Sequence, residues 1–242
     1  MRIYVLFCRR EGDFMAENMH SGHRERMRER FLKTGFDNFE PHEILELILF
    51  YSQPRGDTNE IAHRLIDKFG SVRAVFDADE KMLADVKGMG QQSIAFFKLI
   101  LQLAKAYDLS NGEFEQLDTS QKVRDYFFSS FKGTTKEQLQ MVCLDDELRI
   151  IGRHIVSEGG LSVVPINIRK MVEICIRENC EMILIAHNHP NGVAIPSNED
   201  VVATKKLRES FGNIGIRLLD HVIVDKDRAF SMYDGGYFST IR

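Results

Sequence analysis

The run from residue 181 to 200, EMILIAHNHPNGVAIPSNED, constrains the chain more than any other part of its sequence. An apolar, strand-like segment leads into H-x-H, a Pro-Asn-Gly turn follows, and a helical pattern begins after Ser197. Histidines at i and i+2 of an extended segment point to the same side, so His187 and His189 can reach one ion. Asp200 can add a carboxylate oxygen. Three protein ligands leave a fourth position open, which is typical of a catalytic zinc site.

Ser197 and Asp200 also have a purely structural interpretation. Ser-x-x-Asp before an apolar helical run is a capping box, in which Ser197 is the N-cap and Asp200 is the third helical residue. The Ser197 hydroxyl is a poor zinc ligand but a good hydrogen-bond donor. The sequence leaves both roles open for Ser197, and Asp200 can serve the helix and an ion together.

The pattern H-x-H-x7-S-x2-D resembles the signature of the JAMM (MPN+) metalloprotease family. The longer run ILIAHNHPNG…PSNEDVVATKKL…IGIRLLDHVIV is similar to its bacterial RadC branch, as are the earlier segments GHRERMRERF and FEPHEILELILFYSQPRGDTNEIAHRLIDKFGS. The resemblance therefore covers nearly the whole chain. It implies a three-layer α/β domain with a mixed sheet, a Zn²⁺ cofactor, and a catalytic glutamate on the strand that opens this domain.

Glu137, just before the strand-like QLQMVCL, is the best positional match for that glutamate, and Glu158 is the alternative. Such a carboxylate takes a proton from the attacking water and passes it to the leaving amine. Ser197 is the candidate for stabilising the oxyanion. Asp220 is a candidate for orienting a zinc-bound imidazole. His221 lies on an apolar strand pattern and is predicted to be a core histidine.

The chain of 242 residues is long enough for two domains. We expect a leader of undetermined structure at 1–18, a helical RadC-type domain at 19–108, a polar linker at 109–118, and the metalloprotease-like domain at 119–242. In the last of these, helical and strand patterns alternate: helices are expected at 120–131, 167–179 and after Ser197, and strands near 138–144, 148–157, 182–186, 217–224 and 229–233.

The helical domain contains one candidate DNA contact. Gly88-Met89-Gly90 precedes a long amphipathic helix, as in a helix-hairpin-helix module, and such a loop presents backbone N–H groups to phosphate. Lys87, Gly88 and Gly90 would make the contact, although a plain helix-linking turn is the favoured interpretation. The alternating arginines and glutamates of residues 23–31 are expected to form a solvated helix face.

Composition excludes several classes of protein. A net charge of −4 provides no global field for nucleic acid. The four cysteines show no C-x-x-C spacing, and no apolar run approaches the ~20 residues of a membrane span. We therefore expect a cytoplasmic, zinc-dependent metallopeptidase or isopeptidase that acts on a protein or peptide. The alternative is a DNA-repair-associated, DNA-binding accessory protein with a structural or vestigial zinc site.

Overall fold

A computed structural model describes residues 11–110, 115–159 and 167–238. The chain divides into two compact units, Met1–Leu99 and Ile100–Arg242, and the division falls inside a long helix, α6 (Gln91–Leu109). The predicted linker begins where this helix ends, and its residues 111–114 lie outside the described part. The predicted leader is also largely outside it, although helix α1 (Glu11–Thr34) already includes residues 11–18. No helix of the described part is long and apolar enough to cross a membrane.

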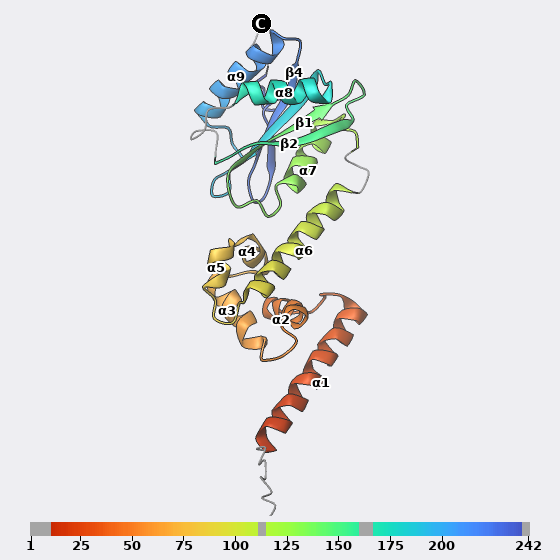
Figure 1. Cartoon of the computed structure of the whole chain (residues 1–242), viewed down its shortest axis with the longest axis vertical. Helices are drawn as coiled ribbons and strands as arrows, with labels where there is room; N and C mark the ends of the chain where they lie inside the picture. The colour runs from red at the N-terminus through yellow and green to blue at the C-terminus, as the bar shows by residue number, and fades with distance from the viewer. Residues whose placement is uncertain (1–10, 111–114, 160–166, 239–242) are drawn as a thin grey trace, which may run out of the picture. The chain divides into compact units, whose positions relative to one another are not determined.

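The first unit is helical, as the sequence predicts (Figure 1). After α1 it contains α2 (Pro41–Ser52), α3 (Asn59–Phe69), α4 (Val72–Asp77), α5 (Glu80–Ala84) and the start of α6. Ser71 and Asp79 cap α4 and α5 through side-chain oxygens that accept from the N–H groups of Ala74 and Met82. Gly70 ends α3 in the left-handed conformation. These ends depend on local chemistry, because each is set by a residue at the end of its own helix.

Arg24 departs from the solvated face predicted for residues 23–31, whereas Arg26 and Arg28 are exposed as expected. Arg24 is only 9% exposed. Its guanidinium donates to the carbonyl oxygens of Gln53 at 2.9 Å and Gly56 at 2.8 Å, and it lies 4.7 Å from the centre of the Phe50 ring. The prediction is wrong for this residue because its partners come from α2 and the following loop, far along the chain.

The second unit is an α/β domain around one five-stranded sheet. Its strands are β1 (Gln138–Leu144), β2 (Ile150–Glu158), β3 (Met182–Asn188), β4 (Arg217–Val224) and β5 (Ala229–Ser231), in the order β2-β1-β3-β4-β5. β3 and β4 are parallel and the other neighbours are antiparallel. The sheet is mixed, as expected.

Helices cover both faces of this sheet, which confirms the three-layer prediction (Figure 1). Helix α7 (Ser120–Ser130) packs Tyr126 and Phe127 on one face, which we call the α7 face. Helices α8 (Ile168–Glu178) and α9 (Asn198–Gly212) cover the other, which we call the α8/α9 face. Ile183 and Ile185 of β3 point to the α8/α9 face. Since side chains alternate along a strand, His187 points there too.

Candidate metal centre

His187 and His189 lie where β3 runs out of the sheet. His187 is the sixth residue of the strand and is 3% exposed. The backbone N–H of His189 donates to the carbonyl of Val224 at 2.7 Å, so the chain stays extended beyond the last residue of β3. This extension places both imidazoles on one side, as the H-x-H spacing predicts.

Asp200 comes from the first turn of α9. Ser197 is the N-cap, and its hydroxyl accepts from the Asp200 N–H at 3.1 Å while the Asp200 carboxylate accepts from the Ser197 N–H at 2.8 Å. The predicted capping box is therefore present. It fixes the Asp200 side chain, which is 3% exposed, against the end of β3.

The three side chains converge on one point. His187 Nε2 lies 2.9 Å from His189 Nε2 and 3.2 Å from Asp200 Oδ1, and His189 Nε2 lies 3.7 Å from Asp200 Oδ2. Two ligands of a tetrahedral zinc ion are about 3.3 Å apart when each bond is about 2.0–2.1 Å long. The separations fit that geometry, and these residues form the one group of metal-ligating side chains found in the described part of the chain.

The chemistry of the donors also fits a cation. His189 Nδ1 lies 2.9 Å from the carbonyl oxygen of Val193, which can only accept, so this nitrogen carries the ring proton. With this proton on Nδ1, Nε2 can direct a lone pair at His187 and Asp200. The Asp200 carboxylate accepts from both the N–H and the hydroxyl of Ser197, and these hydrogen bonds favour its charged form. A lone pair and a carboxylate facing one another require a proton or a cation between them.

Asn188, the middle residue of H-N-H, contacts the segment that contains Glu137. The Asn188 carboxamide accepts from the Gln138 N–H at 2.8 Å and donates to the Lys136 carbonyl at 3.0 Å, so it clamps the backbone on both sides of Glu137. Sequence reasoning missed this role. The only signal was an amide between two histidines, and the spacing gives no sign of its partners 50 and 52 residues away.

The two candidate glutamates point to opposite faces of the sheet. Leu139 is paired with His187 and lies on the α8/α9 face, and Glu137 shares that face by strand alternation. Glu158 is paired with Gln138, whose amide donates to it at 3.2 Å, so Glu158 belongs to the α7 face. The arrangement favours Glu137.

The Ser197 hydroxyl has one proton to donate, and in the structure it donates a hydrogen bond to Asp200. The hydroxyl donates to Asp200 Oδ2 at 2.7 Å. It lies next to the convergent ligands, so rotation about one bond would redirect this proton. The cap is present, and the oxyanion role stays a prediction.

The structure does not bring Asp220 to the metal centre. Its carboxylate accepts from the Ser231 hydroxyl and from the Tyr233 N–H at 2.9 Å, and it alternates with residues that point to the α8/α9 face. The prediction that Asp220 orients a zinc-bound imidazole is therefore corrected. The neighbouring His221, predicted as a core histidine, is completely buried and contacts His187 instead. Its burial lowers its pKa well below the usual value.

Gly88 and the backbone of Lys87 have partners within their own unit. Gly88 has φ +100°, and a Cβ there would lie 2.7 Å from Ile61 Cγ1, so glycine is required by the turn and by packing. The Lys87 carbonyl accepts from Arg64 at 3.1 Å. A Cβ at Gly90 would meet only open space, and Gly90 has no positive φ, so packing does not explain this glycine. The Gly88 packing fits the plain turn, the Lys87 side chain is exposed, and the DNA contact stays a prediction.

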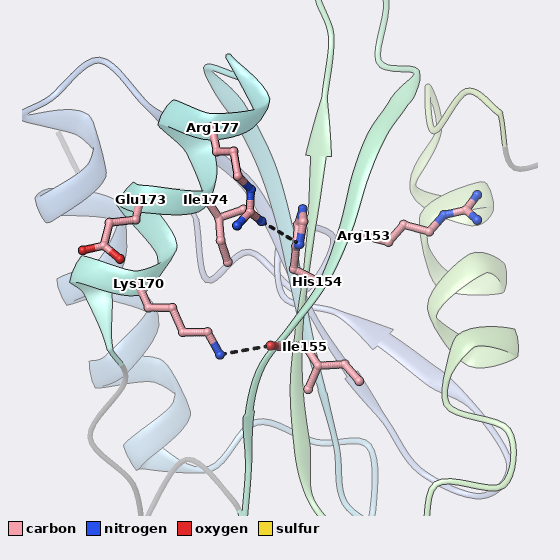
Figure 2. A pocket seen from close by; sticks show the side chains of 7 residues that line it. All are labelled: Arg153, His154, Ile155, Lys170, Glu173, Ile174 and Arg177. Carbon is pink, nitrogen blue, oxygen red and sulfur yellow. Dashed lines mark hydrogen bonds between the residues drawn. The ribbon is translucent and has the colours of Figure 1, made fainter.

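A separate pocket of about 390 Å³ lies between β2 and α8 (Figure 2). Its charged groups already have protein partners: Lys170 Nζ donates to the carbonyls of Ile155 and Val156, and His154 lies 3.1 Å from Glu178. Figure 2 shows Arg153 pointing to the opposite side of β2 from His154. None of the residues that line this pocket belongs to the metal centre. The lining residues are Arg153, His154, Ile155, Lys170, Glu173, Ile174 and Arg177.

Fold and site together define a JAB/MPN-type domain preceded by a helical region. The family model described as a RadC-like JAB domain matches residues 117–237, and the model of the UPF0758 N-terminal region matches residues 19–95. A UPF0758 protein of Fusobacterium nucleatum subsp. nucleatum is 34% identical over 230 residues, which span 92% of this chain and 99% of that protein. The chain belongs to the RadC-like UPF0758 family.

Proposed function

We propose that this protein is a zinc-dependent hydrolase that cleaves peptide or isopeptide bonds in a protein or peptide substrate. The observation that carries the proposal is the convergence of His187, His189 and Asp200 at the end of β3, on the sheet face that Glu137 shares by strand alternation. The family to which the chain belongs supports the same class of chemistry.

His187, His189 and Asp200 would hold the ion through two Nε2 atoms and a carboxylate, the donors that zinc prefers. When bound, zinc supplies Lewis acidity, which activates water and polarises a scissile carbonyl. Glu137 takes the proton of the attacking water and returns it to the leaving amine. The clamp on its neighbouring backbone limits the motion of this carboxylate.

Ser197 would stabilise the oxyanion that forms on the scissile carbonyl. Its hydroxyl lies next to Asp200, and a donor aimed at the developing oxyanion contributes about 3–4 kcal/mol when it is well placed. To act in this way, the hydroxyl must turn from Asp200 toward the substrate. The amide nitrogen that leaves takes its proton from Glu137.

The test is cleavage of a library of peptides by the zinc-loaded full chain, with new amino termini identified by mass spectrometry. We expect cleavage by the wild type and by Glu158→Gln, and none by Glu137→Gln or after chelation. Glu158→Gln is the matched control because it alters the glutamate on the α7 face. A library left uncut by the zinc-loaded wild type, with no peptide retained by Glu137→Gln, would overturn the proposal.

A further inference from the structure

Three polar groups form a continuous chain behind His187, on the side away from the convergent ligand atoms. His187 Nδ1 lies 2.7 Å from His221 Nε2, His221 Nδ1 lies 2.6 Å from Thr204 Oγ1, and Thr204 Oγ1 lies 2.6 Å from the backbone carbonyl oxygen of Asp200. His221 is 0% exposed and Thr204 is 3% exposed. We call this set the His221–Thr204 relay. It is closed to solvent and begins and ends at candidate metal ligands.

The direction of each hydrogen bond in the relay follows from its last member. A backbone carbonyl can only accept, so the single hydroxyl proton of Thr204 must point at the Asp200 oxygen. If it pointed elsewhere, two oxygens would face each other at 2.6 Å with no proton between them. The Thr204 oxygen then accepts from His221 Nδ1–H. His221 Nε2 is left with a lone pair, and it accepts from His187 Nδ1–H.

The relay therefore sets the tautomer of His187. With its proton on Nδ1, the ring directs the Nε2 lone pair at His189 and Asp200, where a metal ion needs it. The opposite direction of donation would place the proton on Nε2 and block coordination. Val193 does the same for His189 by accepting from its Nδ1.

The sequence places these residues far apart, and the fold joins them. Thr204 lies one helical turn after Asp200 on α9, so its hydroxyl reaches back to that carbonyl. His221 lies on β4 and is paired with Ile185 of the neighbouring strand β3. His187 follows Ile185 by two residues and points to the same face. The packing of α9 on β4 closes the relay.

We propose that His221 and Thr204 are positioning residues that hold His187 in its metal-binding tautomer and couple its orientation to Asp200. The inference rests on the proposed function only in that the bound group is a metal ion. Neither residue is among the convergent ligands. Partners of this kind typically change metal affinity by roughly 10–100-fold when they are removed.

The experiment measures zinc affinity by competition with a chromophoric chelator in three variants of the full chain. Thr204→Val keeps the side-chain shape and removes the hydroxyl, so we expect affinity to fall by roughly 10–100-fold. Thr204→Ser keeps the hydroxyl and should stay within a few-fold of wild type. Ser130→Ala removes an equally buried hydroxyl from α7 that bonds Phe127 and Gln140, and it should leave affinity unchanged.

A second readout uses the wild type and needs no variant to fold. Nitrogen-15 NMR of labelled histidine side chains reports which ring nitrogen carries the proton, and we expect Nδ1–H for His187 and His221. An Nε2–H tautomer of His221, or unchanged zinc affinity in folded Thr204→Val, would overturn the inference. If the tautomers are as expected but the zinc-loaded wild type cuts no peptide and Glu137→Gln retains none, the inference stands and the proposed function is refuted.

Discussion

Replacing Asn188 with alanine should separate the clamp around Glu137 from the metal ligands. The Asn188 side chain is 4% exposed and makes two good hydrogen bonds, with the Gln138 N–H and the Lys136 carbonyl. A longer contact of 3.5 Å to the Thr134 carbonyl adds little. Alanine would remove the hydrogen-bond partner of both backbone groups, in a buried or partly buried environment.

The expected cost follows from those two partners. A buried backbone group left unsatisfied costs about 1–3 kcal/mol, and the partly buried Lys136 carbonyl can regain some hydration. The sum is about 2–4 kcal/mol in the free energy of unfolding. Because the clamp spans Glu137, hydrolysis should also fall. His187 and His189 are held by the backbone of β3 and by Val224, so zinc binding should remain.

Urea unfolding of the zinc-loaded protein gives the free energy by linear extrapolation. The matched control is Asn167→Ala, which removes an exposed asparagine that caps α8 by accepting from the Lys170 N–H at 3.0 Å, and it should cost about 1 kcal/mol. If Asn188→Ala costs no more than this control, the side chain does not hold the backbone around Glu137. If Asn188→Ala lost zinc at normal stability, the separation of the clamp around Glu137 from the metal ligands would be refuted.

Three further predictions concern the site itself. The double variant His187→Ala/His189→Ala should lose the approximately one zinc per chain expected in wild type, and equal metal contents would refute the site. Ser197→Ala should cost about 1 kcal/mol of stability through the lost cap, and it should lower kcat by roughly 10²–10³ if the hydroxyl also stabilises the oxyanion; unchanged turnover per folded molecule would leave only the cap. Zinc affinity should fall as the pH is lowered, because protons compete with the ion for its ligand atoms; chelator competition across pH checks this, and a flat profile would contradict imidazole ligation.

Sequence alone determined the parts of this protein that depend on short spacings. Histidines two residues apart on an extended segment must share a side, and Ser197 three residues before Asp200 must form a cap if a helix begins there. Helix ends at Gly70, Ser71 and Asp79 follow the same local logic. The alternation of strands and helices also indicated the α/β class of the second unit.

Tertiary structure decided the questions that depend on strand register and long-range packing. Glu137 and Glu158 are equivalent as sequence, but pairing of β1 with β2 and β3 puts them on opposite faces. Asp220 and His221 are neighbours in the chain, and strand alternation sends only His221 toward His187. A shift of one residue in register reverses every such assignment, and no local pattern specifies that register.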